Sequence, residues 1–269
     1  MIFDNKKTSL VIATYNWPKA LDLVLKSVLN QTLLPGEIRI ADDGSGEDTK
    51  RVIESYQAKF DIPVKHFWHE DNGYRKTFIL NDAMRGIENE YIIQIDGDVI
   101  LHPRFIEDHL KWCKKGCWLN GSRVLLGKDI TQEIQSSGKV TFSPLSSDIT
   151  NRLNAVRLPL LRNLLYDKEA FSTNARGCNM SYWAADFFKV NGFNQDIVGY
   201  SREDSELAAR FSNIGVKRRL LKFSGVQYHL DHKLASRSRS EQNINIEKQT
   251  IDSGVTFCTN GLEKLASTV

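Results

Sequence analysis

The first half of the chain alternates two kinds of segment, and this alternation constrains the fold more than any other feature. Short apolar runs rich in β-branched residues indicate four strands, at 8–13, 37–41, 64–68 and 91–95. Between them, apolar residues recur at helical spacing, at 21–29, 49–60 and 77–87. Such strand-helix units with short connections predict an α/β fold with a Rossmann-like, mostly parallel, doubly wound sheet flanked by helices.

Two carboxylates, Asp96 and Asp98, end the run at 91–98. Parallel α/β sheets bind ligands at the carboxyl edge of their strands. Two carboxylates there suit a divalent cation and the hydroxyls of a phosphorylated ligand. Asp-Gly is also common turn chemistry at the end of a strand. This segment alone is equally compatible with a ligand site and with a turn.

The loop after the first strand excludes two familiar ways of holding a nucleotide. Residues 13–18 carry neither the glycine fingerprint of dinucleotide-binding folds nor the lysine-containing loop of P-loop proteins. We therefore expect phosphates to be held through a metal ion on the acidic pair, with few direct donors from the protein.

A second acidic pair, Asp42 and Asp43, follows the second strand and so belongs to the same sheet edge. A carboxylate there can accept the imide N–H of uracil, and Tyr15 offers a flat face for the base. The alternative is structural, with Asp42, Asp43 and Ser45 capping the next helix.

Cations stand out in two places. Arg75, after the third strand, is placed to pair with a diphosphate, whereas Lys76 is expected to be only part of a solvated helix start. A basic cluster, 217–219 with Arg237 and Arg239, could rest on an anionic membrane. Its alternative is an exposed, solvated strand and tail.

Two further groups lie in the second half. Glu203 and Asp204 open a predicted helix, where the helix dipole favours acids, so a cap and a general base are equally supported. His229 and His232 follow the last predicted strand. An imidazole there is a candidate ligand for a metal held by Asp98, although such a histidine pair is often structural.

The second half is otherwise less regular. Residues 120–174 show no clear period, and we interpret them as a partly mobile excursion at the ligand edge. Helical patterns return at 179–190 and 204–214. A strand is predicted at 216–223, and the polar tail after Ser236 is expected to be helical only in part.

Composition describes a soluble globular protein with a sizeable core, since 41% of its 269 residues are hydrophobic. The net charge of +3, from 36 basic and 33 acidic residues, does not indicate nucleic acid as a partner. No apolar run approaches the roughly 20 residues of a membrane span, so any membrane contact is expected to be peripheral.

Cysteine usage favours a reducing compartment. The four cysteines are scattered, and no secretory signal precedes the first strand, so the cytoplasm is the expected location. Cys113 and Cys117 are interpreted as thiols at a helix end, because no second pair stands at zinc-like spacing.

Taken together, these motifs resemble a family 2 glycosyltransferase of the GT-A fold. The matching segments of the first half are 11–16, 27–32, 41–45 and 96–98. Three others, at 176–180, 190–194 and 199–206, are similar to the galactosyltransferase-like carboxyl-terminal segment of such enzymes. The resemblance covers most of residues 8–232, and the order of its motifs is highly specific.

The resemblance implies a nucleotide-sugar site at the sheet edge. Thr14, Tyr15 and Asp43 would hold uracil, and Asp96 would contact the ribose. The implied nucleotide-sugar-binding residues are Thr14, Tyr15, Asn16, Asp43, Arg75 and Asp96. The usual proline before Thr14 is Ala13 here, which is a mild departure.

The resemblance also implies a metal site and a base. Asp98 would ligate Mn²⁺ or Mg²⁺ together with His229, and His232 is the reserve candidate. Asp204 would act as the catalytic base, and Glu203 would help to bind the donor or acceptor sugar.

The implied reaction is inverting, metal-dependent transfer of a hexose or N-acetylhexosamine from a UDP-sugar to a hydroxyl of a glycan or lipid-linked glycan. Bacterial surface polysaccharide synthesis is the implied pathway. The segment 199–202 departs from the family pattern and leaves the sugar open. The alternatives are a catalytically silent nucleotide-sugar or carbohydrate binding module and, less favoured, a sugar nucleotidyltransferase, which should carry a glycine-rich basic loop after the first strand.

This resemblance also divides the chain. We expect one GT-A domain with a nucleotide-sugar-binding half at 1–115, an acceptor-binding and catalytic half at 116–235, and a tail at 236–269.

Overall fold

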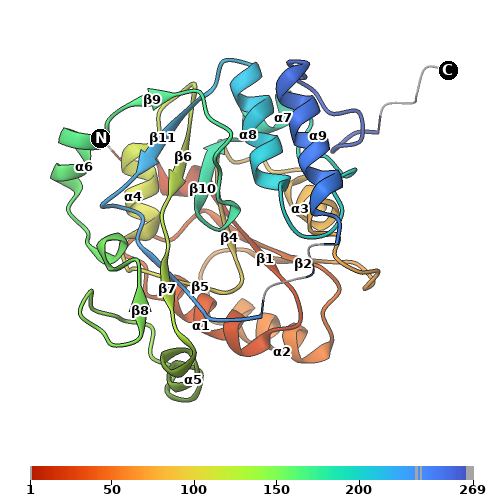
Figure 1. Cartoon of the computed structure of the whole chain (residues 1–269). Coiled ribbons are helices and arrows are strands. Elements are labelled where there is room, and N and C mark those ends of the chain that lie inside the picture. Colours follow the sequence, from red (N-terminus) through yellow and green to blue (C-terminus); the bar gives the residue numbers. More distant parts are fainter. Residues whose placement is uncertain (1, 234–235, 237, 265–269) are drawn as a thin grey trace.

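The computed structural model describes residues 2–233, 236 and 238–264, and a large central sheet organises it (Figure 1). The first half supplies β1 (Thr8–Thr14), β2 (Glu37–Asp42), β3 (Val64–Trp68) and β4 (Tyr91–Asp96). These strands pair in parallel and are connected by α1 (Pro18–Leu29), α2 (Glu47–Gln57) and α3 (Lys76–Met84). The predicted α/β fold with a mostly parallel sheet is confirmed.

Four strands from the second half complete the sheet, namely β6 (Cys117–Gly121), β9 (Glu169–Ala170), β10 (Met180–Trp183) and β11 (Lys217–Leu221). The strand order is β3-β2-β1-β4-β10-β6-β11-β9. β10 lies antiparallel between β4 and β6. Helix α4 (Phe105–Trp112) leads from the first half into β6.

The helix predicted over 179–190 is wrong in its first part. Residues 180–183 form β10, and helix α7 spans only Ala184–Lys189. All four residues of β10 are buried, because both faces of this central strand are covered. A strand buried on both faces shows no alternation, so its pattern cannot be told from that of a buried helix by period alone.

A second, four-stranded sheet has the order β5-β12-β7-β8 and lies beside the carboxyl end of β4. Its strands are β5 (Val99–Leu101), β7 (Val124–Leu126), β8 (Ile149–Thr150) and β12 (Gln227–His229). β12 is antiparallel to β5, with His229 opposite Val99. The sheet therefore brings residues more than a hundred positions apart to the end of the fourth strand.

The segment 120–174 is more regular than its sequence suggested. Besides β7, β8 and β9, it contains α5 (Lys128–Ser137) and α6 (Pro159–Tyr166). These elements are short, and α5 buries only Ile130, Thr131 and Ile134. Few buried positions leave little periodic signal, which explains why the pattern showed no period.

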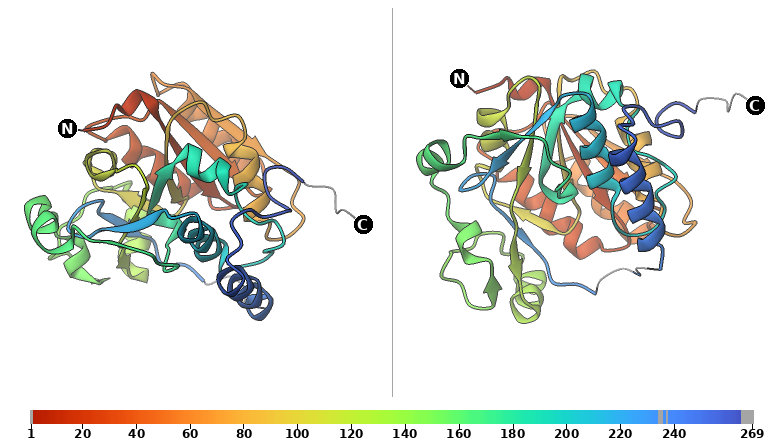
Figure 2. Two further views of the ribbon diagram at one scale, coloured as in Figure 1. Left: turned by 90° about the horizontal axis from the view of Figure 1, so that it is seen from above. Right: turned by 45° about the horizontal axis from the view of Figure 1, so that its top comes forward.

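The hydrophobic core lies on both faces of the large sheet. Because successive side chains of a strand point to opposite faces, Leu10 and Ile12 of β1 face one cluster and Val11 and Ala13 face the other. The first cluster includes residues of α1, α2 and α4, and the second includes residues of α3, α7 and the later helix α8 (Glu203–Asn213). Figures 1 and 2 show these helices on either side of the sheet.

A buried ion pair connects α8 and the final helix to this core. Arg210 of α8 forms a bidentate pair with Glu206, at 2.6 and 2.9 Å, and also donates to the carbonyls of Val190 and Gly192. Thr250 of the final helix, α9 (Ser240–Asp252), donates to Glu206 at 3.1 Å. The tail after Ser236 is thus partly helical, as expected.

A chain of buried hydrogen bonds runs through His109 of α4. Its Nδ1 lies 2.7 Å from Ser181 Oγ, which is 2.8 Å from the Tyr91 hydroxyl. Its Nε2 lies 3.1 Å from Asn179 Oδ1, which can only accept, so Nε2 carries the proton of the neutral ring. Burial lowers the pKa of His109 to about 3.

The basic cluster predicted at 217–219 is mostly engaged inside the fold. Arg219 is buried and pairs with Asp167, while Arg218 donates to the Asn174 carbonyl. Arg239 packs beside Gly199, and Arg237 lies outside the described residues. In the part of the chain that the structure describes, we find no helix both long and apolar enough to cross a membrane.

The prediction of two thiols at a helix end is correct for Cys113 and wrong for Cys117, which begins a strand. Cys113 follows α4 and its thiol faces the Leu110 carbonyl, whereas Cys117 begins β6. All four cysteines lie within the described residues and are free thiols.

Candidate functional site

The ends of β1, β2 and β4 meet at one edge of the large sheet. The N–H of Asp43 donates to the Thr14 carbonyl at 3.0 Å, and the N–H of Gly97 donates to the Ala13 carbonyl at 2.6 Å. A Cβ on Gly97 would lie 2.9 Å from that carbonyl oxygen and from Thr14, so only glycine allows this approach. The structure therefore brings Thr14, Asp43 and Asp96 together, as the sequence predicted.

Asp43 is held as an oriented hydrogen-bond acceptor. Its Oδ2 accepts the backbone N–H of Arg75 at 2.9 Å, and its Oδ1 lies 2.7 Å from Nε2 of His69. The side chain is buried, and burial raises its pKa against these two contacts. Each oxygen of the ionised carboxylate retains further accepting capacity for a ligand.

Asp42 has a different role from Asp43. It is fully buried, accepts the N–H of Ser45 at 2.9 Å and lies 3.0 Å from Nε2 of His66. Helix α2 begins after Gly46 without a hydrogen bond from a capping side chain. The alternative that this acidic pair caps α2 is therefore wrong, and Asp42 instead closes the turn that presents Asp43.

Tyr15 lies beside this acceptor and is 51% exposed. Its hydroxyl donates to Asp71 Oδ2 at 2.9 Å, which tethers the ring to the loop after β3. Gly44, with φ of 95°, makes the close passage possible, because its Cβ would lie 2.6 Å from the Cα of Asp71. An exposed, tethered aromatic ring next to an oriented acceptor suits a nucleobase.

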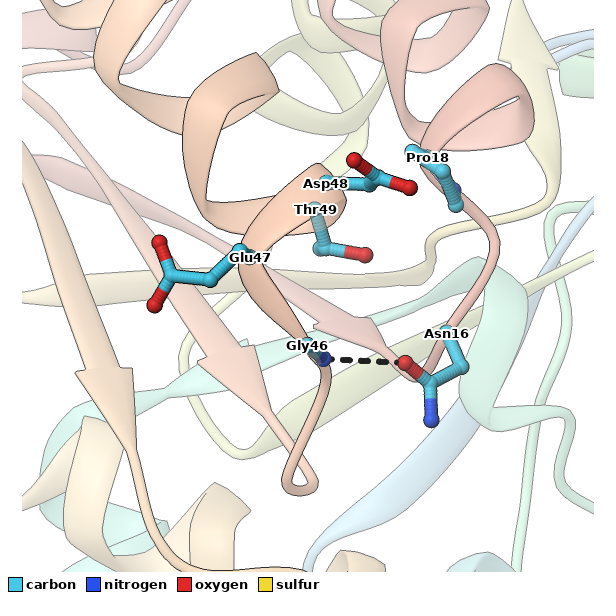
Figure 3. Close-up of a pocket in the computed structure, with 6 residues that line it drawn as sticks. All are labelled: Asn16, Pro18, Gly46, Glu47, Asp48 and Thr49. Atoms are coloured by element: carbon cyan, nitrogen blue, oxygen red, sulfur yellow. Dashed lines mark hydrogen bonds between the residues drawn. The ribbon is translucent and has the colours of Figure 1, made fainter.

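Asn16 fixes the loop instead of facing Asp43. Its N–H donates to Ser45 Oγ at 2.8 Å, and its Oδ1 accepts the N–H of Gly46 at 3.0 Å (Figure 3). It lines a cavity of about 250 Å³ between the starts of α1 and α2. Glu47 and Asp48 also line that cavity, and their charge makes it unsuitable for phosphate.

The two neighbouring cations after β3 lie in different surroundings. The guanidinium of Arg75 lies over the Phe78 ring, 4.3 Å from its centroid, and lines a second cavity of about 360 Å³ with His69 and Gln195. Lys76 was expected to be solvated, but its side chain is only 13% exposed. That expectation is wrong, because two carboxylates surround the ammonium group and compensate its burial.

Lys76 links the two halves of the site. Its Nζ lies 2.7 Å from Asp96 Oδ1 and 3.4 Å from Glu203 Oε1. Burial alone would lower the pKa of Lys76, but Asp96, Tyr74 and Glu203 raise it well above its ordinary value. Burial raises the pKa of Glu203, and Lys76 opposes that shift.

Asp98, His229 and His232 form the group that best fits a metal ion among the described residues. Their ligand atoms lie within 4.8 Å of one another. Asp98 Oδ2 is 3.7 Å from His229 Nε2 and 3.1 Å from His232 Nε2. The second sheet creates this cluster, because the N–H of Leu230 donates to the Asp98 carbonyl at 3.0 Å.

The orientation of both imidazoles fits metal coordination. Each Nδ1 lies 2.9 Å from a backbone carbonyl, that of Leu230 for His229 and that of Lys233 for His232. Donation from Nδ1 leaves Nε2 of the neutral ring as the ligand atom. Asp98 Oδ1 is buried without a hydrogen-bond partner among the described residues, so this acceptor can take a cation or a donor from a ligand.

The pKa shifts in this cluster also fit a cation site. The hydrogen bond to Asp98 raises the pKa of His232 to about 9, against the effect of burial. Burial alone would raise the pKa of Asp98, but the two histidines lower it below its ordinary value. A bound cation would take the place of the proton that His232 otherwise holds.

Asp204 is positioned at the start of α8. Its Oδ2 accepts the N–H of Gly177 at 2.9 Å, and its Oδ1 accepts the N–H of Ser205 at 2.7 Å. The preceding Ser201 and Arg202 have φ of 97° and 79°, an uncommon conformation for residues other than glycine. Such strain is often retained at functional sites, which makes this turn a candidate site element.

Comparison with known proteins agrees with this geometry. The sequence profile of glycosyl transferase family 2 matches residues 9–158, and that described as the N-terminal domain of galactosyltransferase matches residues 164–233. The chain therefore belongs to glycosyl transferase family 2.

Curated relatives act on different molecules. The chain is 27% identical over 234 residues to validoxylamine A glucosyltransferase of Streptomyces hygroscopicus subsp. limoneus. This match covers 77% of the chain and 48% of the relative. It is 24% identical to chondroitin synthase of Escherichia coli, covering 77% of the chain and 32% of that protein. The chain thus spans about half or less of the length of these two relatives.

Solved structures share the GT-A fold. A mannosyltransferase from Pyrobaculum calidifontis, in complex with GDP-Man and Mn²⁺, matches 92% of this chain and 64% of its own at a TM-score of 0.63 and 15% identity. S. aureus TarS in complex with UDP matches 89% of this chain and 64% of its own at a TM-score of 0.60 and 15% identity. At these identities the likeness concerns the fold.

Proposed function

We propose that this chain transfers a hexose or N-acetylhexosamine from a UDP-sugar to a glycan hydroxyl, with inversion and with a divalent cation, Mn²⁺ or Mg²⁺. The observation that carries the proposal is the convergence of Asp98, His229 and His232 beside the sheet edge that holds Asp43 and Asp96. A bound cation would neutralise the negative charge that develops on the departing diphosphate.

The nucleotide half supplies recognition of the base and ribose. Asp43, oriented by His69 and the Arg75 N–H, accepts the imide N–H of uracil, while the exposed ring of Tyr15 stacks on the base. Asp96 accepts a ribose hydroxyl, and Lys76 holds its carboxylate in place. His69 and Lys76 therefore act as positioning residues.

The second half supplies the proton acceptor. In a single displacement, the acceptor hydroxyl attacks the anomeric carbon from the face opposite the diphosphate, which gives inversion. Asp204 orients that hydroxyl and takes its proton as the bond forms, because the N–H groups of Gly177 and Ser205 hold the carboxylate. Glu203, held near Lys76, helps to bind the sugar.

The proposed acceptor is a glycan. One curated relative is a chondroitin synthase, which supports a glycan as the acceptor. We propose that the acceptor is a glycan or lipid-linked glycan and that the transfer takes place on the cytoplasmic side, in surface polysaccharide synthesis.

A donor panel tests this proposal. Nucleoside diphosphate release would be measured from UDP-glucose, UDP-galactose, their N-acetylated forms and GDP-mannose, with and without Mn²⁺, using Asp204→Asn as the control for catalysis. We expect metal-dependent release from at least one UDP-sugar and none from GDP-mannose. Preferred turnover of GDP-mannose would contradict the role of Asp43. UDP-sugar binding without turnover of any donor, with acceptor present, would favour a silent binding module.

A further inference from the structure

Helix α6 presents leucines to solvent on its outer side. Leu160 and Leu164 are 88% and 80% exposed, Leu165 is 51% exposed, and Leu158 just before the helix is 50% exposed. Leu160 and Leu164 are four residues apart, so they lie one above the other on one side of the helix, with Leu165 beside them. A surface helix normally turns such an apolar stripe toward the core.

The inner side of α6 carries a buried cation, which is unusual for a surface helix. Arg162 is fully buried and is the residue of α6 that the core encloses. Its guanidinium donates to the Leu220 carbonyl at 3.2 Å and to Asp167 at 2.9 Å, and it lies 4.4 Å from the Trp112 ring centroid. These contacts fix the rotation of α6, so its leucines cannot turn inward without leaving a buried cation unpaired.

Exposed apolar side chains concentrate in the same stretch of the chain. Leu145, Leu153 and Phe171 are 89%, 71% and 60% exposed. Together with the leucines of α6, they place between 145 and 171 half of the large exposed hydrophobic residues in the described part of the chain. Figures 1 and 2 show α6 at the periphery of the molecule in every view, so its outer side is accessible. The leucines that share the outer side of α6 form exposed apolar surface of the kind that marks an interaction site.

The charges near α6 favour an anionic partner, because the acids there are already paired. All three acids between residues 143 and 171 are engaged: Asp148 accepts two N–H groups at the start of α5, Asp167 pairs with Arg162 and Arg219, and Glu169 pairs with Lys114. The cation Lys168 is exposed, and Lys217 lies 5.7 Å from the Phe171 ring. Arg152 is exposed but donates to the carbonyls of Pro144 and Ser146.

We propose that α6 docks the protein on the surface of an anionic lipid bilayer, with its leucines inserted between the headgroups and Lys168 and Lys217 against the phosphates. Leucines on one side of a short helix, bordered by cations, are the arrangement that interfacial helices use. A helix of eight residues is roughly 12 Å long, so it lies in the interface plane and cannot span the bilayer. The proposed membrane contact thus rests on α6 and includes only Lys217 of the cluster at 217–219.

Vesicle sedimentation tests this proposal without any need for turnover. The protein would be mixed with vesicles of phosphatidylcholine containing about a third phosphatidylglycerol, and with pure phosphatidylcholine vesicles. The test variant is Leu160→Ser with Leu164→Ser, whose exposed side chains leave the core untouched. The matched control is Ile244→Ser with Ile251→Ser on α9, which also removes two exposed apolar side chains.

We expect the protein and the α9 control to sediment with anionic vesicles, and the α6 variant to lose at least about tenfold in partitioning. Lys168→Glu with Lys217→Glu should lose binding to anionic vesicles similarly. The proposal is overturned if the unaltered protein stays in the supernatant, or if the α6 variant sediments as well as the control. A dimer in sedimentation velocity that the α6 variant dissociates, without vesicle binding, would instead assign this face to a second copy of the chain.

Discussion

Lys76 Nζ lies 2.7 Å from Asp96 Oδ1, which holds the lysine against the end of β4 in the nucleotide half of the site. The same ammonium group approaches Glu203 at 3.4 Å. One buried cation therefore sets the positions of a carboxylate proposed to bind ribose and of a carboxylate proposed to bind sugar.

Replacing Lys76 by Met should destabilise the fold and weaken UDP binding. Asp96 and Glu203 would lose their shared cation, and leaving partly buried charges uncompensated is expected to lower the free energy of unfolding by about 2 to 3 kcal/mol. Urea denaturation and UDP titration would measure the two effects. Adding Glu203→Gln should restore part of the stability, whereas an unchanged midpoint in Lys76→Met would show that the pair contributes nothing.

The pairs His69–Asp43 and His66–Asp42 offer a matched comparison. His69→Ala should weaken UDP binding by about tenfold, because Asp43 loses the contact that orients it toward uracil. His66→Ala removes an equivalent contact from Asp42, which closes the turn, so it should affect stability more than UDP affinity. Calorimetric titration with UDP would separate them, and equal losses of affinity in the two variants would contradict the distinction.

Asp204→Asn should reduce kcat by about 10² to 10⁴-fold, because the amide cannot accept the proton of the attacking hydroxyl. Affinity for UDP should stay within about threefold, since the Asp204 oxygens contact Gly177 and Ser205, outside the nucleotide half. Steady-state turnover and UDP titration on the same preparation would provide both numbers. Near-normal turnover would remove Asp204 from the reaction.

Acid should destabilise the fold through His109. Burial holds its pKa at about 3 in the folded state, against roughly 6.5 in the unfolded chain. Between these values the unfolded state binds more protons, so stability falls as pH drops below about 6.5. The part due to His109 should be about 1 kcal/mol between pH 7 and 5.5.

Urea denaturation at several pH values would measure that slope, and His109→Asn should flatten it. Other buried acids contribute to the total, so the difference between the two proteins isolates His109. A variant with an unchanged slope would mean that His109 is not buried in its neutral form.

The parallel half of the fold was predictable because its strands and helices carry different periods. The shared location of Asp43, Asp96 and Asp98 was predictable as well, since the ends of parallel strands share one sheet edge. His229 and Asp98 were paired through the family resemblance. The structure places His229 on β12 opposite Val99, the residue after Asp98, in a second sheet that no local pattern indicated.

Other features depended on tertiary context. Lys76 appeared to be a solvated lysine, because the carboxylate of Glu203 that buries it lies far away in the chain. β10 appeared helical because a strand buried on both faces has no alternation. The apolar stripe of α6 would ordinarily predict a core-facing helix, and only the burial of Arg162 shows that it faces outward.

The central claim is that Asp98, His229 and His232 hold the cation that glycosyl transfer requires. Calorimetric titration of Mn²⁺ into the protein saturated with UDP, repeated on Asp98→Asn and His232→Ala, tests it most directly. We predict one site in the unaltered protein and at least about a tenfold loss of affinity in each variant, with UDP-sugar turnover lost in parallel. Unchanged Mn²⁺ affinity in both variants, or full turnover in the presence of a chelator, would contradict the account.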